Sequence, residues 1–321
     1  MKRLIGREKE IESLEAYVDS GQAEFIAIYG RRRVGKTFLI NQLFRNRLAF
    51  SLTGIIDGTP SEQMESYVQA LEFNGYKINE HPKNWLTAFA ELRKFLQPKI
   101  NSGEPCIVFI DEISCFDSQR SGFVRALGFF WNSWASLQDN LKLIICGSVT
   151  SWMITNIIDS KGGLHNRVTH EIALHQFTLH ETELYLLNRG FNWSRLTILQ
   201  AYMCLGGVPY YLSLLSASES LAENLDRLFF DRDAELQKEY SRLYKTLFKS
   251  PEPYMKIVKL LAESKQGLTR QEISTKLKIS GKALTDQLGN LQSCDIIRLY
   301  YVKDAKIKKN GGIYQLMDFY S

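Results

Sequence analysis

The 321-residue sequence contains few cysteines and no long apolar segment. Its five cysteines include no CxxC pair, which argues against a zinc site or a disulfide framework. No apolar run approaches the roughly 18 residues that a transmembrane helix needs. The N-terminus becomes charged at Lys2 and Arg3, unlike a signal peptide. We therefore expect a cytoplasmic protein without a membrane span.

A strong excess of one charge is also missing. The 40 basic and 35 acidic residues leave a net charge of +5, which is too small to establish nucleic-acid binding by itself. Hydrophobic residues make up 45% and charged residues 23% of the chain, as in soluble globular proteins with sizeable cores. The length predicts two or three domains.

The first half of the chain alternates short apolar segments with segments of helical periodicity. We expect helices over residues 8–19, 37–44 and 123–137, and mostly helix over residues 59–96 with a stop at Pro98. Such alternation indicates a parallel sheet covered on both faces, hence an α/β fold. The segments that predict buried strands are residues 24–29, 106–110, 141–146 and 168–174.

The second half changes character twice. From about residue 179 the strands stop, and Thr178 with Glu181 resembles a capping box that opens a helix. The helical region that follows is interrupted at GGVP, residues 206–209, and ends near two prolines. The last seventy or so residues predict three helices and then two strands, the order of a winged helix. These segments are residues 254–263, 269–277, 281–293, 296–302 and 313–317.

The segment GRRRVGKT, residues 30–37, matches the phosphate-loop pattern GxxxxGK[ST] in full. It lies between a predicted strand and a predicted helix, which is the context that the pattern requires. Glycines let several backbone N–H groups converge on phosphate oxygens, and the helix N-terminus adds its positive dipole. Lys36 would lie between the β- and γ-phosphates, and Thr37 would give its hydroxyl to Mg²⁺. We therefore predict that the chain binds ATP with Mg²⁺.

Polar residues follow two of the predicted strands. Ligands of open α/β sheets bind at the carboxyl edge, where Asp111 would hold Mg²⁺ and Glu112 would act as general base on water. Ser148, just after the strand that ends at residue 146, is the candidate sensor of the γ-phosphate, with Thr150 as the second candidate. The alternative for these two residues is a cap on the following helix.

Three further assignments remain open on the residues alone. The arginines at residues 31–33 hold phosphate, contact a partner or form a solvated patch. Arg167 reaches the nucleotide as an arginine finger or lies on the surface. Pro209 packs on the base or sugar as part of a lid, or simply breaks a helix. The histidines that recur every five residues from His165 fit neither one helix face nor one strand face, so we expect no zinc cluster.

Several motifs occur in one order: IGREKE at residue 5, GRRRVGKT, CIVFIDEI, CGSVTSWM and GGVPYYL. Together they resemble the archaeal-type ATPase family, among the STAND-like and AAA-related P-loop ATPases. The resemblance covers nearly the whole chain. It implies a P-loop NTPase core of ASCE/AAA-like type with sheet order 5-1-4-3-2, a helical lid and a winged-helix domain. The expected boundaries are residues 1–178, 179–249 and 250–321.

The resemblance also implies residue roles. Gly6 and Arg7 would lie near the adenine, Gly207 and Pro209 match the GxP element of STAND lids, and Arg167 matches an arginine that follows a glycine-rich stretch. Many family members continue into a PD-(D/E)XK nuclease-like domain, whereas this sequence ends at residue 321. Either the sequence is truncated before that domain or the protein acts without it, so these residues do not themselves indicate nuclease activity. The residues assigned to the nucleotide are Gly6, Arg7, Gly30, Arg31, Arg32, Arg33, Val34, Gly35, Lys36, Thr37 and Pro209; those assigned to catalysis are Glu112, Lys36, Ser148 and Arg167; those assigned to Mg²⁺ are Thr37 and Asp111.

The favoured function is a nucleotide-driven switch that hydrolyses ATP slowly. The alternative is an ATPase that contacts duplex DNA through the winged helix, because lysines would bind phosphates without sequence preference. The would-be recognition helix is short of arginine, which weakens base readout, and winged helices also serve as protein-interaction or homo-oligomer surfaces. A metabolic phosphotransferase is disfavoured because no acceptor site is visible. The lysines proposed for DNA are Lys282, Lys306, Lys308 and Lys309.

Overall fold

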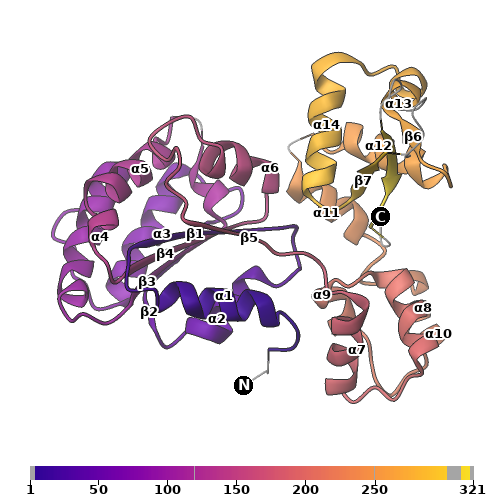
Figure 1. Ribbon diagram of the computed structural model, residues 1–321, viewed down its shortest axis with the longest axis horizontal. Helices are drawn as coiled ribbons and strands as arrows, with labels where there is room; N and C mark the ends of the chain where they lie inside the picture. Colours follow the sequence, from indigo (N-terminus) through magenta and orange to yellow (C-terminus); the bar gives the residue numbers. More distant parts are fainter. Residues whose placement is uncertain (1–3, 119, 249, 302–311, 319–321) are drawn as a thin grey trace. The chain divides into compact units, whose positions relative to one another are not determined.

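The computed structural model describes residues 4–118, 120–248, 250–301 and 312–318 (Figure 1). Contacts divide the chain into two compact units. The first comprises Met1–Gly30 and Lys36–Leu174, and the second comprises Arg31–Gly35 and His175–Ser321. The middle of the phosphate-loop motif therefore groups with the second unit, while its two ends belong to the first.

A five-stranded parallel sheet forms the centre of the first unit. Its order is β2-β3-β4-β1-β5, with every neighbouring pair parallel, which confirms the order that the family resemblance implied. β4 lies between β1 and β3. Because the three strands are parallel, their carboxyl ends lie at the same edge of the sheet. The strands are β1 (Glu24–Tyr29), β2 (Leu48–Thr53), β3 (Cys106–Asp111), β4 (Leu141–Gly147) and β5 (His170–Ala173).

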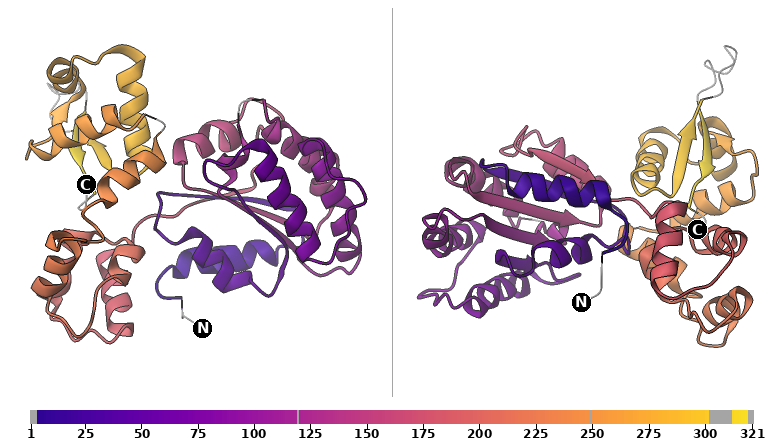
Figure 2. Two further views of the ribbon diagram at one scale, coloured as in Figure 1. Left: turned by 180° about the vertical axis from the view of Figure 1, so that it is seen from behind. Right: turned by 60° about the horizontal axis from the view of Figure 1, so that its bottom comes forward.

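Helices cover both faces of this sheet (Figures 1 and 2). β3 and β4 are buried along their whole length, as a doubly covered parallel sheet requires. One face carries α1 (Glu8–Val18) and α2 (Lys36–Phe44), and the other carries α3 (Pro60–Phe73), α4 (Trp85–Ile100) and α5 (Phe123–Ser133). Shorter helical turns are η1 (Ile113–Phe116), η2 (Ala135–Leu137), α6 (Thr150–Met153) and the π-helix η3 (Ile154–Ile158).

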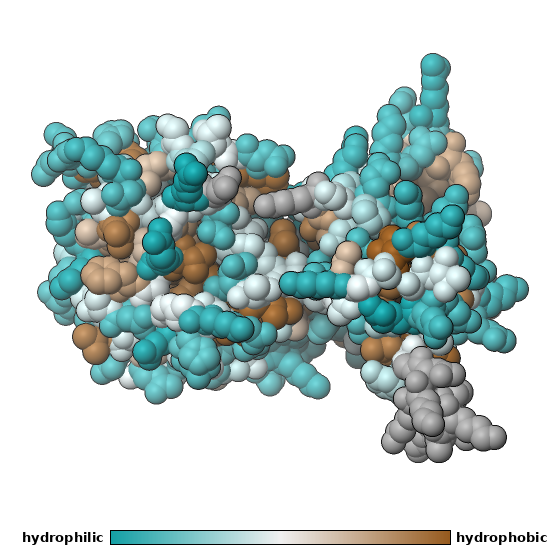
Figure 3. Space-filling view, turned by 90° about the horizontal axis from the view of Figure 1, so that it is seen from above, coloured by the Kyte–Doolittle hydropathy of each residue, from teal (hydrophilic) through white to brown (hydrophobic). Residues whose placement is uncertain are grey.

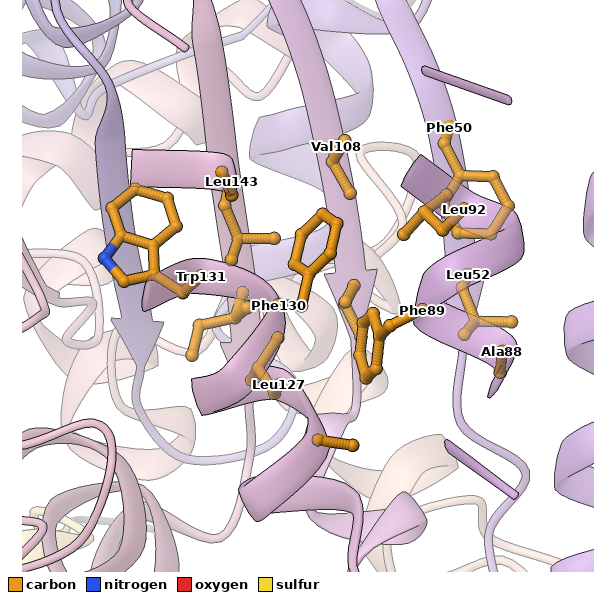
Figure 4. Packing of buried hydrophobic residues seen from close by; sticks show 14 of the residues in the cluster. Phe50, Leu52, Ala88, Phe89, Leu92, Val108, Leu127, Phe130, Trp131 and Leu143 are labelled. Atoms are coloured by element: carbon orange, nitrogen blue, oxygen red, sulfur yellow. The ribbon is translucent and has the colours of Figure 1, made fainter. Parts of the chain in front are cut away.

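The larger apolar core lies between the sheet and α3 to α5. Alternate strand residues such as Val108 and Leu143 point to this face, where they meet Phe89 of α4 and Trp131 of α5 (Figure 4). All four side chains are at most 5% exposed. Since burying a large apolar side chain contributes about 1.5–3 kcal/mol, this cluster holds the strands and therefore the sheet edge that follows them.

Two sequence predictions were wrong in this unit. β2 was missed because it is an edge strand whose residues alternate between buried and exposed, unlike the continuous apolar runs of its neighbours. Pro98 does not stop a helix but lies inside α4, which ends at Ile100. A proline that close to the C-terminus removes one helical hydrogen bond without breaking a long segment.

The second unit begins with short helices after β5. The predicted capping box is confirmed: the Thr178 hydroxyl accepts the Glu181 N–H at 3.2 Å, and the Glu181 carboxylate accepts the Thr178 N–H at 2.8 Å. At the predicted helix break, a Cβ on Gly207 would lie 1.9 Å from the carbonyl oxygen of Phe177, so only glycine fits there. The helices are α7 (Leu179–Asn188), α8 (Arg195–Leu205), α9 (Pro209–Ser213), α10 (Leu221–Leu225), the π-helix η4 (Asp226–Phe230) and α11 (Glu239–Leu247).

The C-terminal segment of this unit packs three helices against a small antiparallel sheet of order β6-β8-β7. The three helices and the last two strands were predicted, whereas the two-residue β6 was not. Their apolar side chains form a separate core. Lys303, Lys306, Lys308 and Lys309 lie outside the described residues. The elements are α12 (Glu252–Ala262), β6 (Leu268–Thr269), α13 (Arg270–Leu277), α14 (Gly281–Ser293), β7 (Ile297–Tyr300) and β8 (Ile313–Leu316).

The face of the molecule drawn in Figure 3 is mixed rather than dominated by one apolar patch. In the space-filling view, hydrophilic side chains cover most of the visible face and hydrophobic ones form small scattered groups (Figure 3). Within the described ranges, every helix is too short or too polar to cross a membrane.

Candidate functional site

The phosphate-loop motif joins β1 to α2, which is the strand-to-helix setting that the sequence predicted. β1 ends at Tyr29, and α2 begins at Lys36. Gly30 has φ 150°, and a Cβ at this position would lie 2.2 Å from the carbonyl oxygen of Leu174. The first glycine of the motif is therefore required by the close approach of the chain after β5, as well as by its backbone angle.

The charged and hydroxyl ends of the motif make short contacts within the first unit. Lys36 is buried, and its ammonium group donates a 2.7 Å hydrogen bond to the carbonyl oxygen of Gly30. The hydroxyl of Thr37 donates a 2.5 Å hydrogen bond to Oδ2 of Asp111, 74 positions later in the chain. The fold thus brings together the two residues that the sequence assigned to Mg²⁺.

Asp111 is the last residue of β3 and is only 2% exposed. Burial raises the pKa of this carboxyl group, and the neighbouring Glu112 raises it further, while the hydrogen bond from Thr37 and the charge of Lys36 act in the opposite direction. The net pKa is raised. A carboxylate that is costly to ionise in the protein alone gains most from a cation placed beside it.

Glu112 has a left-handed backbone conformation, with φ 46° and ψ 46°. This conformation costs an L-residue roughly 1–2 kcal/mol, and such strain clusters at functional sites. The carboxylate accepts a 2.6 Å hydrogen bond from the hydroxyl of Ser148, which is buried at the end of β4. The neighbouring strands therefore place Ser148 against the predicted general base.

The alternative of a helix cap is wrong for both hydroxyl candidates. α6 has Val149 as its N-cap residue and receives no side-chain capping bond. Thr150 is the first residue of α6, and its buried hydroxyl has no hydrogen-bond partner in the described part of the chain. Of the two candidates, Ser148 is the one in contact with Glu112.

The arginines of the loop have different environments. Arg31 is 1% exposed, which excludes a solvated patch at this position, and it forms a 2.6 Å ion pair with Asp318. Burial alone would lower the pKa of Arg31, but Asp318 and Tyr211 outweigh it, so that the pKa is raised. Removing one partner of such a buried pair typically costs about 3–5 kcal/mol.

Arg33 is held by the same unit. Its guanidinium pairs with Glu239 at 2.5 Å and lies 3.9 Å from the ring centroid of Tyr210. The hydroxyl of Tyr211 also contacts the Glu239 carboxylate, at 3.3 Å. Sequence reasoning missed these carboxylate partners, because Asp318 and Glu239 follow the loop by 287 and 206 positions and no local pattern connects them.

The remaining predicted residues lie at three places. Gly6 and Arg7 are buried at the start of α1, where Arg7 has φ 68° and lies 3.7 Å from the carboxylate of Glu10. Arg167 is exposed before β5. Pro209 is the first residue of α9 in the second unit. Their roles toward a nucleotide remain predictions, as do those of Arg32, Val34 and Gly35.

Residues 4–215 match the profile of a family described as "ATPase domain predominantly from Archaea". The chain belongs to this family. The matched segment contains the phosphate loop, Asp111, Glu112, Ser148 and the helix break before Pro209. The family resemblance inferred from the sequence is therefore confirmed.

Two curated relatives come from Methanocaldococcus jannaschii. An uncharacterised protein is 26% identical over 318 residues, which is 98% of this chain, and the chain spans 66% of the length of that relative. An uncharacterised ATP-binding protein is 44% identical over 43 residues, 13% of this chain and 73% of its own length.

Solved structures share the fold. The Walker-type ATPase of Pyrococcus abyssi has a TM-score of 0.68 and 19% identity, with 99% of this chain and 94% of that chain covered. The ORC2 protein of Aeropyrum pernix, in complexes with ADPNP and ADP, has a TM-score of 0.58 and 14% identity, with 98% and 91% covered. At these low identities, the similarities show a shared fold.

Proposed function

We propose that the chain binds ATP with Mg²⁺ at residues 30–37 and hydrolyses it slowly. The observation that carries the proposal is the convergence of Thr37 and Asp111, at 2.5 Å, beside Lys36 in the strand-to-helix turn. The family and the ATP-binding relative support the nucleotide, and the ADPNP and ADP complexes of the Aeropyrum pernix protein support its adenine base.

The residues present fit Mg²⁺. A hydroxyl and a carboxylate are hard oxygen ligands, and Mg²⁺ in nucleotide sites takes only one or two such ligands from the protein. Thr37 and Asp111 would hold the ion, which when bound supplies charge neutralisation at the phosphate oxygens. The raised pKa of Asp111 agrees with this fit, because burial makes the carboxylate costly to ionise and a bound cation would offset that cost.

The chain's own residues account for the remaining chemistry. Lys36 would leave the carbonyl of Gly30 and place its ammonium group against the phosphates. Glu112 would accept a hydrogen bond from the attacking water and so orient it toward the γ-phosphate, with Ser148 fixing the carboxylate. Backbone N–H groups of the loop and the N-terminus of α2 would stabilise the transferred phosphoryl charge.

Other residues complete the proposed site. Gly6 and Arg7 would contact the adenine, Pro209 would pack on the base or sugar, and Arg167 would act as an arginine finger. The helical segment after residue 178 would serve as the lid, and the segment from residue 250 as a winged helix, since its three helices and antiparallel sheet follow in that order. Closure of the lid on the γ-phosphate would make the chain a switch.

A DNA-binding ATPase is the second candidate. Lys276, Lys278 and Lys282 are exposed around the start of α14, the helix that would enter the major groove. Lys306, Lys308 and Lys309 are also proposed for DNA contact from the sequence, and these three lie outside the described residues. Phosphate contacts by these lysines would give affinity without sequence preference. The same surface would serve equally for a protein partner or a second copy of the chain.

A steady-state ATPase assay with and without duplex DNA, combined with a native mass measurement, tests both candidates. Slow hydrolysis that is unchanged by DNA supports the switch, while fast hydrolysis stimulated by DNA supports the alternative. Lys36→Ala is expected to abolish measurable ATP binding, because it removes the charge that faces the phosphates. Retained micromolar binding by a folded Lys36→Ala protein would reject the assigned site.

A further inference from the structure

The middle of the phosphate loop is held by side chains from far along the chain. Residues Arg31–Gly35 group with the second unit, although Gly30 and Lys36 on either side belong to the first. Within the second unit, Arg31 pairs with Asp318 after β8, and Arg33 pairs with Glu239, the first residue of α11. Two carboxylates from separate elements thus hold two alternate residues of the loop.

The first pair is fully buried, whereas the second joins a buried carboxylate to an Arg33 side chain that is 30% exposed. The side chains of Arg31 and Asp318 are 0% exposed, and Gln176 donates a further 3.1 Å hydrogen bond to the same Asp318 oxygen. The Glu239 side chain is 4% exposed and also meets the hydroxyl of Tyr211. Charge-assisted hydrogen bonds to buried carboxylates restrict geometry more strongly than pairs between two exposed side chains.

The backbone of the loop is held as well. Arg33 has φ 74°, a left-handed conformation that a non-glycine residue adopts only when its surroundings impose it. Its carbonyl oxygen accepts the N–H of Tyr210 at 3.4 Å, and its guanidinium lies over the ring of the same tyrosine. Phosphate loops bind through backbone N–H groups, so the backbone shape at these residues decides how the phosphates are received.

We propose that Asp318 and Glu239 are positioning residues for the nucleotide: through Arg31 and Arg33 they hold the phosphate loop in the shape that receives the phosphates. Nucleotide affinity then depends on the segments that carry these carboxylates, α11 and the stretch after β8. The inference rests on the proposed ATP site, and it adds two residues that lie outside every local motif of that site.

Binding of a β,γ-imido analogue of ATP, measured calorimetrically with Mg²⁺, tests this inference. Asp318→Asn is expected to weaken binding about tenfold or more, the order of effect that loss of one charge-assisted hydrogen bond produces. Arg31→Gln should have a similar effect, and adding Asp318→Asn to it should change little, because Asp318 acts through Arg31. Unchanged affinity in Asp318→Asn, or effects that multiply in the double variant, would overturn the proposal for this pair.

The second pair gives an independent test, which also stands if the buried Asp318 variant does not fold. Glu239→Gln is expected to weaken binding, with no further loss in an Arg33→Gln background. The matched controls are Asp286→Asn and Glu263→Gln, two exposed carboxylates of the same unit, which should bind as the wild type does. Tighter binding by Glu239→Gln would show that the Arg33–Glu239 pair weakens nucleotide binding, and would overturn the proposal.

Melting temperatures separate this positioning role from a simple loss of stability. Melting temperatures identify variants that are merely less stable, and all titrations are run well below the lowest of them. A purely structural role would lower the melting temperature and leave the dissociation constant unchanged, contrary to the proposal. Wild-type protein that binds no nucleotide, matching Lys36→Ala, would overturn the proposed function together with this inference, whereas wild-type binding with unaffected variants overturns the inference alone.

Discussion

The hydroxyl of Ser148 donates a 2.6 Å hydrogen bond to the carboxylate of Glu112. The two residues follow neighbouring strands, β4 and β3, so the sheet order itself creates the contact. Glu112 is thereby held in one orientation before any nucleotide binds. This arrangement separates two properties of the proposed site that mutations can test one at a time: the presence of the base and its orientation.

Glu112→Gln is expected to retain Mg-ATP binding and to lower turnover at least a hundredfold, in line with the 10²–10⁴-fold contribution of general bases. The amide keeps the size of the side chain and the hydrogen bond from Ser148 but cannot take a proton. Single-turnover hydrolysis and equilibrium binding, measured on the same protein, check the two halves of this prediction. An unchanged hydrolysis rate would show that another residue positions the water.

Ser148→Ala is expected to lower turnover about tenfold while changing ATP affinity less than twofold, because a hydrogen bond to a charged group contributes about 1.5–3 kcal/mol and acts here on the base alone. Thr150→Val is the matched control, since it removes a buried hydroxyl without a partner at nearly constant volume. It should leave turnover unchanged and stability equal or higher. Loss of ATP affinity in Ser148→Ala would instead indicate direct contact with the nucleotide.

Asp111→Asn is expected to stabilise the nucleotide-free protein at neutral pH. The pKa of Asp111 is raised in the folded state, so the folded protein binds more protons than the unfolded chain between the ordinary and the raised pKa, and its stability falls as pH rises through that window. The loss of folding stability caused by ionised Asp111 is complete above the raised pKa. The melting-temperature gain of the variant should therefore be largest at neutral pH and shrink toward pH 4.

The same variant should lose the stabilisation that Mg-ATP gives the wild type, because ligand-induced stabilisation requires binding to the folded state. Melting curves with and without Mg-ATP provide this comparison. A variant that is less stable than the wild type at neutral pH would contradict the raised pKa, and one that still responds fully to Mg-ATP would remove Asp111 from the metal site.

Gly207→Ala is expected to destabilise the second unit by more than about 2 kcal/mol, since overpacking against backbone forces the chain to move. The new Cβ would lie 1.9 Å from the carbonyl oxygen of Phe177. Gly289→Ala within α14 is the matched control, because its Cβ would meet nothing within 4 Å and alanine favours a helix by up to about 1 kcal/mol. Urea unfolding should give opposite signs for the two variants.

The sequence predicted what depends on local pattern. β3 and β4 are buried along their whole length, so they appear as continuous apolar runs. Asp111 ends β3, and the phosphate loop directly follows β1, another largely buried strand. β2 alternates between buried and exposed residues at the sheet edge and lacked that signal. The sheet order was predicted from the family resemblance, because the apolar segments alone do not indicate which strands are neighbours.

The partners of the loop arginines illustrate the limit of such reasoning. Nothing near Glu239 or Asp318 in the sequence marks them, because a buried ion pair is specified by tertiary packing and not by spacing. A carboxylate partner for Arg31 could have been suspected only on the premise that this arginine is buried, and the sequence does not show which carboxylate is buried with it. Contacts at separations of more than 200 positions are what the structure adds to the proposed site.

Thr37 provides the sharpest test of the metal assignment. Thr37→Ser keeps the hydroxyl that reaches Asp111, whereas Thr37→Val keeps the shape and removes the oxygen. If the hydroxyl is a ligand of Mg²⁺, the valine variant should require a much higher Mg²⁺ concentration for ATP binding, and the serine variant should resemble the wild type. ATP affinity measured across a Mg²⁺ titration compares them directly. Equal Mg²⁺ dependence in the two variants would show that the 2.5 Å contact with Asp111 only fixes the start of α2, and the ion would then need other ligands.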